Sequence, residues 1–310
     1  MISDLFTVTV LIGILSSGIR LATPYLYASI GETFGQRSGV LNLGVEGQML
    51  LGAFAAFFVA LTTGNLWLGV LAAMIVGALM GLAMAYVTVN LHAQQGISGI
   101  GFYLFGLGMS DLLFQKLMGT VETVKGFPPI NFPGLSKIPG IGEIFFSQNI
   151  LVYGAYLLVP LAWFVLNKTT LGLKIRSVGE NPDSADSLGV SVARVRYFTI
   201  ILGGILSGIA GASLSIALLN VFQQNMTSGL GFIAVALVYF GGWHPWGVLG
   251  GALLFSMVNS MQLWVQVLGI PIPSDIAVMM PYVLTILVLV ATVSRVHAPS
   301  ALTKPFERED

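Results

Sequence analysis

The feature that most constrains this chain is a series of long apolar runs that continues along almost its whole length. A helix needs about 20 mostly apolar residues to cross a membrane, because it rises about 1.5 Å per residue. Nine segments meet or approach this requirement: 6–29, 46–63, 66–90, 97–118, 149–166, 197–219, 229–243, 247–268 and 276–294. The eighth follows the seventh with almost no loop between them, so the two form either a tight hairpin or one broken element. We therefore expect a single domain over residues 1–310, an all-α polytopic membrane bundle with about nine or ten spans.

The composition agrees with a chain that lies in membrane lipid. Hydrophobic residues make up 55% of it and charged residues 8%, whereas soluble domains carry about 25% charged residues. Thirteen basic residues balance thirteen acidic ones, which argues against a nucleic-acid partner. The chain has no cysteine and its three histidines lie far apart, so we expect no metal site and no cofactor.

The polar stretch 31–45 does not fit a span that faces lipid. It reads GETFGQRSGVLNLGV, which is too polar for that position and too apolar at its end for a free loop. Irregular backbone at membrane depth is tolerated only where it is buried in protein or lines a wet cavity. We expect a re-entrant or broken segment here, and the side on which the N-terminus lies depends on its course.

Basic residues indicate the orientation of the chain. Segment 167–196 and the tail 295–310 both concentrate Lys and Arg close to apolar runs, which is typical of cytoplasmic segments. Four predicted spans separate the two segments, so both lie on the same side, and we assign that side to the cytoplasm. Segment 119–148 is rich in Pro and Gly and its few charges balance, so it is expected to be an extracytoplasmic loop.

The longest polar stretch on the predicted cytoplasmic side contains the signals of a short helix. Asn181 is a suitable N-cap, Pro182 suits the first helical position, and Asp183 lies in the first turn, where the helix dipole favours a negative charge. Gly189 stands where a glycine commonly ends a helix. The sequence therefore predicts about two helical turns after Asn181.

The side chains of this short helix fall on two faces. Ala185 and Leu188 are three residues apart on one face, and Asp183 and Asp186 are three apart on another. A helix this short is not stable alone. It is either a chance turn in a solvated loop or a docking helix for a cytosolic subunit, and the agreement between caps and faces favours docking.

Three strings of residues resemble a known family. GENPDSADSLGV, preceded by LGLKIRSVG, is similar to the coupling segment of bacterial ABC permeases, in the branch for branched-chain amino acids, ribose-type sugars and nucleosides. GQRSGVLNLGVEGQMLLGAF and SGLGFIAVALVYFGGWHPWGVLGGALLF resemble the nucleoside-type members, and the whole resemblance covers residues 10–293. His244 and Trp246 depart from the family pattern, which has Asn and a smaller apolar residue there. The implied coupling residues are Gly179, Glu180, Asn181, Pro182, Asp183, Ala185, Asp186, Leu188 and Gly189.

The resemblance also implies partners and a location. It implies a multi-pass permease of the bacterial inner membrane that pairs with a second permease, related or identical, and works with an extracytoplasmic substrate-binding lipoprotein. A nucleoside is the expected substrate, and a pentose, another simple sugar or an amino acid is the alternative. The sequence has no GxxxxGK[ST] phosphate loop, so ATP hydrolysis is expected in a separate cytosolic ABC ATPase and no catalytic residue in this chain.

Polar residues near two predicted helix starts are candidates for the substrate path. Asn42 and Glu46 are four residues apart, so on a helix they would share a face, and Gln48 follows closely. Amide and carboxylate groups suit the hydroxyls of ribose and the polar edge of a base. Alternatively, Glu46 caps a helix start or pairs with Arg37.

A second polar cluster precedes a glycine-rich apolar run. Gln223, Gln224 and Asn225 form either a gate in the substrate path or a hydrated loop. Elsewhere, glycines four residues apart, such as 77/81 and 204/208, predict close packing between spanning helices.

Two other classes of protein are possible from composition alone. A membrane-embedded enzyme needs catalytic groups clustered at one depth, but the few charges here are spread over separate spans. A secondary transporter driven by an ion gradient usually carries ionisable residues in mid-span and does not need a capped cytoplasmic helix.

Overall fold

The computed structural model describes residues 7–269, single residues between 273 and 290, and residues 297–307. Its long helices are α1 (Val8–Arg37), α2 (Val45–Thr63), α3 (Leu66–Ala85), α4 (Gln95–Leu117), α6 (Ile150–Lys168), α9 (Val192–Ser213) and α11 (Pro245–Val267). Single π-helical turns, η2 (Tyr86–Asn90) and η4 (Leu214–Leu218), extend α3 and α9. The shorter elements are β1 (Pro129–Asn131), η3 (Leu135–Lys137), α5 (Ile141–Phe145), β2 (Ser147–Asn149), α7 (Thr170–Glu180), α8 (Pro182–Ser187) and α10 (Leu230–Phe240).

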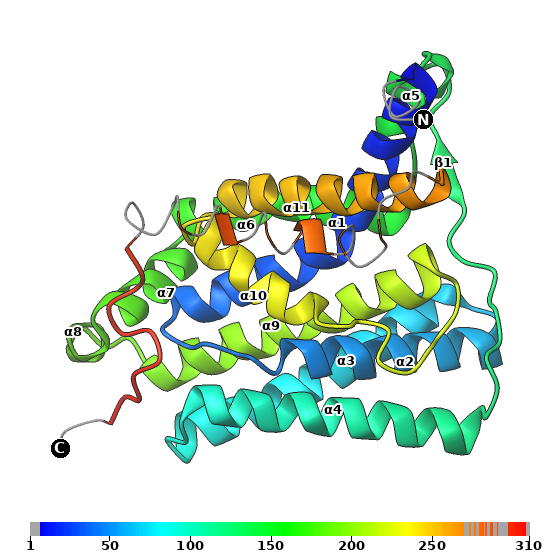
Figure 1. Ribbon diagram of the computed structural model, residues 1–310. Coiled ribbons are helices and arrows are strands. Elements are labelled where there is room, and N and C mark those ends of the chain that lie inside the picture. Colours follow the sequence, from blue (N-terminus) through cyan, green and yellow to red (C-terminus); the bar gives the residue numbers. More distant parts are fainter. Residues whose placement is uncertain are drawn as a thin grey trace.

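The prediction of an all-α polytopic bundle is confirmed (Figure 1). Seven helices in the described part of the chain are long and apolar enough to cross a membrane. The predicted span 276–294 lies mostly outside the described residues, as do both ends of the predicted tail 295–310.

The predicted runs 229–243 and 247–268 form a hairpin rather than one broken helix. A tight turn over residues 241–244 joins α10 to α11. With 11 residues, α10 is about 16 Å long, roughly half the thickness of the hydrocarbon core. It is therefore a half-length helix and not a full span.

The polar stretch 31–45 is divided between two structures. Residues 31–37 continue α1 to its end, and residues 38–44 form a largely buried, non-helical connection to α2. Irregular backbone inside a membrane bundle is thus covered by protein, as physical chemistry requires. As a result α2, like α10, begins partway along the length of α4 and not at the end of the bundle (Figure 1).

The two ends of the bundle carry different segments. We call them the α8 end, with α7, α8 and residues 297–307, and the β1 end, with segment 119–149 (Figure 1). Helix α1 starts at the β1 end, where the Ser16 hydroxyl donates to the Glu143 carbonyl at 3.2 Å. Segment 167–196 and the described part of the tail, residues 297–307, therefore lie at the same end of the molecule, as the sequence predicts.

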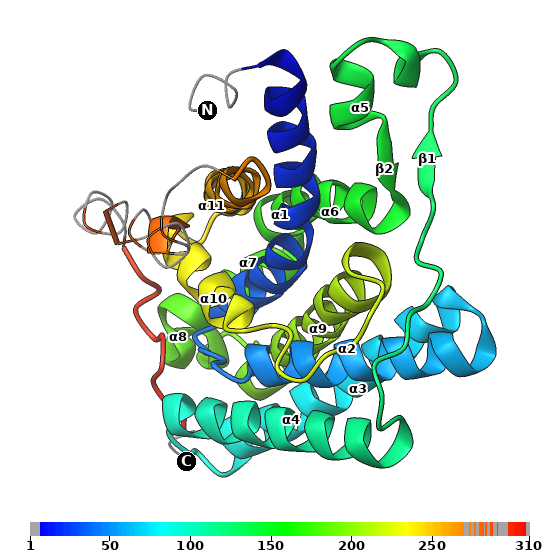
Figure 2. The same ribbon diagram turned by 45° about the vertical axis from the view of Figure 1, so that its right-hand side comes forward.

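Helix α9 lies in the middle of the bundle, against α1, α2 and α3 (Figure 2). It packs closely against α3, where Gly204 faces Gly77. A Cβ atom added to either glycine would come within 2.2 Å of the other's carbonyl oxygen. The predicted close packing at these glycines is confirmed.

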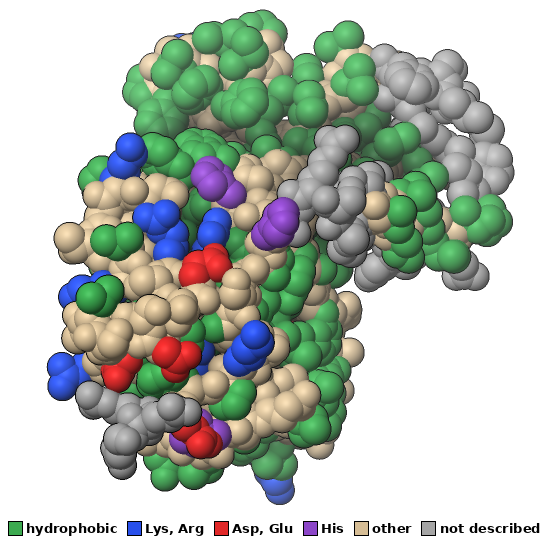
Figure 3. Space-filling view, turned by 90° about the vertical axis from the view of Figure 1, so that its left-hand side faces the viewer, with side chains coloured by type: hydrophobic (Ala, Val, Ile, Leu, Met, Phe, Trp, Pro, Cys, Tyr) green, Lys and Arg blue, Asp and Glu red, His purple; other side chains and the backbone are tan. Residues whose placement is uncertain are grey.

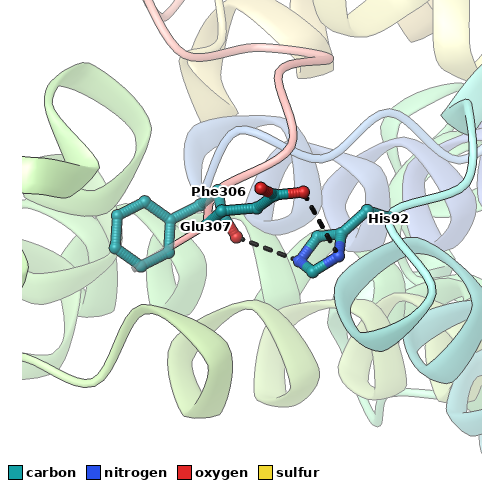
Figure 4. A network of polar contacts seen from close by, with 3 residues as sticks. All are labelled: His92, Phe306 and Glu307. Carbon is teal, nitrogen blue, oxygen red and sulfur yellow. Dashed lines mark hydrogen bonds and ion pairs between the residues drawn. The ribbon is translucent and has the colours of Figure 1, made fainter. Parts of the chain in front are cut away.

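Residues 297–307 cross the α8 end and are fastened there by hydrogen bonds. The Ala301 N–H donates to the Gly179 carbonyl at 2.9 Å, and the Thr303 N–H donates to the Gly39 carbonyl at 3.1 Å. Farther along, His92 approaches the Phe306 carbonyl at 3.1 Å and the Glu307 carboxylate at 3.8 Å (Figure 4). The segment thus ties α7 to the connections that follow α1 and η2.

Candidate functional site

The most connected buried charge in the bundle interior is Glu46, in the first turn of α2. Its carboxylate accepts hydrogen bonds from the Thr227 hydroxyl at 2.6 Å, the Gly229 N–H at 2.7 Å and the Gly231 N–H at 2.5 Å. The side chain is 1% exposed. Glu46 therefore caps the start of α10, a helix that lies about 180 residues farther along the chain.

The physical reason is the unsatisfied N-terminus of a half-length helix. The first N–H groups of a helix have no partner within it, and the helix dipole places partial positive charge there. Inside a membrane these groups cannot reach water, so a carboxylate from a neighbouring helix is a strong partner. The contact is very close, since a Cβ atom on Gly231 would lie 2.5 Å from the Glu46 Cα. Only glycine fits at that position.

A pocket of about 220 Å³ lies beside this capped helix start. One wall is segment 226–230, which Glu46 holds in place, and the rest of the described lining comes from α1, α11 and Pro281. Tyr25 and Phe255 meet edge to face in it, with ring centroids 5.2 Å apart. The amides of Asn259 and Gln262 supply polar groups from α11. Among the described residues that line the pocket, none has a charged side chain.

Sequence reasoning missed Asn259 and Gln262 because both lie inside an apolar run. Their spacing of three residues places them on one face of α11, and this was the available signal. Tyr25 and Phe255, from helices far apart in sequence, had no local signal at all.

Asn42 and Gln48 lie together but outside the described lining of the pocket. The Asn42 side chain accepts from the Gly44 N–H at 2.9 Å and donates to the side-chain oxygen Oε1 of Gln48 at 3.3 Å. The predicted common helix face of Asn42 and Glu46 is wrong, because α2 begins only at Val45. Asn42 instead shapes the connection before α2. The fully buried Gln48 Nε2 has no hydrogen-bond partner among the described residues.

Gln223, Gln224 and Asn225 are exposed in the irregular segment that leads to α10. The described lining of the pocket does not include them, although the next residues, Met226 and Thr227, belong to it. They therefore lie at the border of the pocket.

The short helix predicted after Asn181 is present as α8. The Asn181 side chain accepts from the Ser184 N–H at 3.0 Å, and Pro182 is the first helical residue. Gly189 has a φ of +82°, the left-handed conformation that suits a glycine after a helix. Before it, α7 ends with Gly179 and Glu180, and the Glu180 carboxylate accepts from the Ser300 hydroxyl at 3.1 Å.

The predicted common face of Ala185 and Leu188 is wrong. Helix α8 ends at Ser187, and the chain then turns, with the Val190 N–H donating to the Ala185 carbonyl at 3.0 Å. Ala185 is 2% exposed and Leu188 is 84% exposed. Leu188 thus projects from the α8 end, where side chains of both charges gather (Figure 3). Asp183 is also exposed, and Asp186 is half-buried.

His244 and Trp246, the two residues that depart from the family pattern, lie in different surroundings. His244 is half-buried before α11, and both burial and the nearby Arg37 charge lower the pKa of its imidazole. Trp246 is 46% exposed on the outside of the bundle. Neither residue is part of the described lining of the pocket.

Within the described residues, no group of three or more His, Cys, Asp or Glu could hold a metal ion. The interior instead offers a capped half-helix and an uncharged pocket that combines aromatic rings with amides. Such a site can bind and release a neutral polar solute.

Comparison with known proteins identifies the chain. The family model for the branched-chain amino acid transport system / permease component matches residues 14–289. The guanosine ABC transporter permease protein NupQ of Bacillus subtilis is 37% identical over 299 residues, covering 92% of this chain and 93% of that protein. The nucleoside ABC transporter permease protein NupC of Lactococcus lactis is 38% identical over 299 residues, covering 93% and 94%.

A relative whose name gives another substrate has a similar identity. The putative glucose ABC transporter permease protein TsgC13 of Haloferax volcanii is 37% identical over 324 residues, covering 96% of this chain and 98% of that protein. No solved structure matches the chain. Such permeases work with an ATPase and with substrate-binding partners, so ATP hydrolysis belongs to a separate subunit. The chain is thus a multi-pass permease of an ABC importer in a bacterial membrane, and it belongs to the family of branched-chain amino acid transport system permease components.

Proposed function

We propose that this permease carries nucleosides and that the pocket between α1, segment 226–230 and α11 is its half of the translocation path. The observation that carries the proposal is the charge state of the site. The N-terminus of α10 would attract an anionic group, but its N–H groups already donate hydrogen bonds to the Glu46 carboxylate. The pocket beside it is lined by uncharged side chains.

This arrangement favours a neutral solute over an amino acid. In transporters with broken helices, the free N-terminus of a half-helix commonly receives the carboxylate of an anionic substrate. Here an incoming carboxylate would meet the negative charge of Glu46. A nucleoside has no such charge, and its ribose hydroxyls and base edge suit the amides of Asn259 and Gln262. Its flat base suits the rings of Tyr25 and Phe255.

The size of the pocket supports a path formed by two subunits. Sites for small molecules usually enclose about 300–1,000 Å³, and the pocket here measures about 220 Å³. A second permease chain, related or identical, would supply the remainder. The nucleoside and guanosine relatives support the substrate class, and the glucose relative keeps a sugar as the second candidate.

We further propose that the α8 end faces the cytoplasm and receives the ATPase. Lys and Arg concentrate in the two segments at this end, as in cytoplasmic loops. Leu188 is 84% exposed there, and it lies outside the helices that are long enough to span a membrane. An apolar side chain in water beside a capped helix suits insertion into a partner's groove. The substrate-binding lipoprotein would then deliver its load at the β1 end.

The test is uptake by the complete transporter reconstituted with its ATPase and binding protein in liposomes. Labelled guanosine should enter, and unlabelled nucleosides should compete where pentoses, glucose and amino acids do not. Competition by glucose alone would favour the sugar, and competition by amino acids alone would contradict the charge argument.

Two variants test the location of the path. Gln262→Leu and Asn259→Leu should each reduce the maximal uptake rate about ten-fold, because each removes a polar partner that a buried solute needs. Met261→Leu is the matched control, since Met261 is 40% exposed on the outer side of the same helix. Wild-type uptake in both amide variants would show that the path lies elsewhere.

A further inference from the structure

A buried polar network surrounds the other end of α10, away from the pocket. Trp243 Nε1 donates to Gln36 Oε1 at 2.7 Å, and Gln36 Nε2 donates to Glu32 Oε1 at 3.0 Å. The same Glu32 oxygen accepts from the Asn42 N–H at 3.0 Å. Arg37 Nε donates to the Trp243 carbonyl at 2.9 Å. Glu32, Gln36, Asn42 and Trp243 are all at most 4% exposed.

The network fixes a backbone conformation that is otherwise unfavourable. Trp243 has a φ of +55°, a left-handed conformation that bulky residues rarely adopt. Such residues persist only where their surroundings hold them, and they concentrate at functional sites. Here the indole N–H and the carbonyl of Trp243 bond to the last turn of α1, and its backbone N–H donates to the Val238 carbonyl of α10 at 3.0 Å. The turn after α10 is therefore fastened to α1.

Both ends of α10 are thus attached to other helices. Glu46 of α2 holds its N-terminus, and Gln36 and Arg37 of α1 hold the turn after its C-terminus. Satisfied buried polar networks make the elements that they join rigid with respect to one another. A short helix that is fixed at both ends can only move together with its anchors.

The α1 anchor also touches the segment that carries α8. A Cβ atom on Gly179 would lie 2.1 Å from the Arg37 carbonyl oxygen, so the backbones of α7 and α1 are in direct contact there. Only Glu180 and Asn181 separate Gly179 from Pro182, the first residue of α8. This contact gives a short, direct route from α8 to Arg37, the residue that holds the α10 turn.

We propose that α10 relays movement of α8 to the substrate pocket, and that Gln36, Arg37 and Trp243 are the positioning residues of this relay. The route runs from α8 through Gly179 and Arg37 to the α10 turn, and along α10 to the pocket wall that Glu46 holds. This inference rests on the proposed docking of the ATPase at α8. Coupling between α8 and the pocket is measured directly by the number of ATP molecules hydrolysed per solute imported.

The experiment uses the complete transporter in liposomes and measures ATP hydrolysed per nucleoside imported. Trp243→Phe removes the indole donor, and Gln36→Met removes its acceptor at similar length. Each should raise the ATP cost of import about ten-fold, while ATP hydrolysis without substrate stays at the wild-type rate. The double variant should be no worse than the poorer single variant, because both changes break the same bond. Trp246→Phe, the same substitution at an exposed position three residues away, should change nothing.

A second pair of variants separates positioning from folding. Arg37→Met removes the donor to the Trp243 carbonyl, whereas Arg37→Lys retains a donor, and Lys should restore most of the coupling that Met loses. If uptake and hydrolysis fall in equal proportion in these variants, the network only stabilises the fold and the relay is refuted. The relay is also refuted if Trp243→Phe and Arg37→Met hydrolyse as much ATP per imported nucleoside as the wild type does.

The relay and the docking role can fail separately. Leu188→Asp tests docking alone, because Leu188 does not contribute to the network. If Leu188→Asp uncouples the transporter and Trp243→Phe does not, the relay is wrong and docking stands. If Leu188→Asp leaves coupling intact, the docking role on which the relay rests is wrong.

Discussion

Replacing the Glu46 carboxylate by an amide is the sharpest test of the capped half-helix. In Glu46→Gln the remaining carbonyl oxygen can accept from two of the three donors, Thr227, Gly229 and Gly231. The new NH₂ group then faces the third donor, and that buried N–H or O–H loses its partner. The variant also loses the negative charge at the helix N-terminus.

These losses can be added from the geometry. A hydrogen bond to a charged group contributes about 1.5–3 kcal/mol, and a charge at a helix terminus contributes about 0.3–1 kcal/mol. The free energy of unfolding should therefore fall by about 2–4 kcal/mol in Glu46→Gln. In a chain of 310 residues, with an unfolding entropy of about 2.1 cal/mol/K per residue, that lowers Tm by roughly 3–6 °C. Thr227→Val removes one donor and leaves the carboxylate two others, so it should cost about 1.5 kcal/mol.

The assay is thermal unfolding of the purified protein in detergent, followed by circular dichroism. From the highest Tm to the lowest, the expected order is wild type, Thr227→Val, Glu46→Gln and Glu46→Ala. Glu46→Ala is last because it leaves all three donors without a partner. Glu143→Gln is the control, since it makes the same change in an exposed side chain at the β1 end. A Glu46→Gln protein that melts within a degree of wild type would show that the carboxylate does not hold α10.

Three further outcomes follow from other contacts. Leu188→Asp should abolish stimulation of the ATPase by substrate and leave Tm unchanged, because Leu188 is 84% exposed; normal stimulation would contradict docking at α8. Gly204→Leu should lower the free energy of unfolding by about 3 kcal/mol, since its side chain would enter the backbone of α3 at Gly77, and thermal unfolding measures this loss. His92→Ala should increase proteolysis of residues 297–307 with little effect on Tm, because exposed ion pairs contribute at most about 1 kcal/mol; equal proteolysis rates would show that other bonds hold this segment (Figure 4).

The features that could be predicted from the sequence are those with local causes. Long apolar runs identify most spans, because hydrogen bonding within one helix satisfies the backbone in lipid without help from other segments. Asn181, Pro182 and Gly189 define α8 because caps act on the residues beside them. The glycines at 77 and 204 indicate close packing because small residues let two helix backbones approach closely.

The features that could not be predicted depend on contacts between distant segments. Hydropathy counts 229–243 as a span, although the helix there, α10, has only 11 residues and begins at Leu230, where Glu46 of α2 holds its start. The pairing of Ala185 with Leu188 failed because a helix boundary shifted by one residue changes which side chains share a face. Glu46 could be recognised as a first-turn carboxylate of α2, but its partners on α10 lie too far along the chain for any local pattern.

A buried carboxylate explains how this fold can contain a helix that begins inside the membrane. Placing an ionisable group in the bilayer costs about 2.5–3.5 kcal/mol on insertion scales. The orphan N–H groups of a half-helix would cost about 1–3 kcal/mol each if left alone. The cost of burying the carboxylate and the cost of the unpaired N–H groups offset one another, because the carboxylate accepts the hydrogen bonds that the helix start must make. The pairing therefore fixes the depth at which α10 begins, and with it the depth of the wall that segment 226–230 gives to the pocket. The same pairing leaves no positive pole free, which is why a neutral solute suits this path.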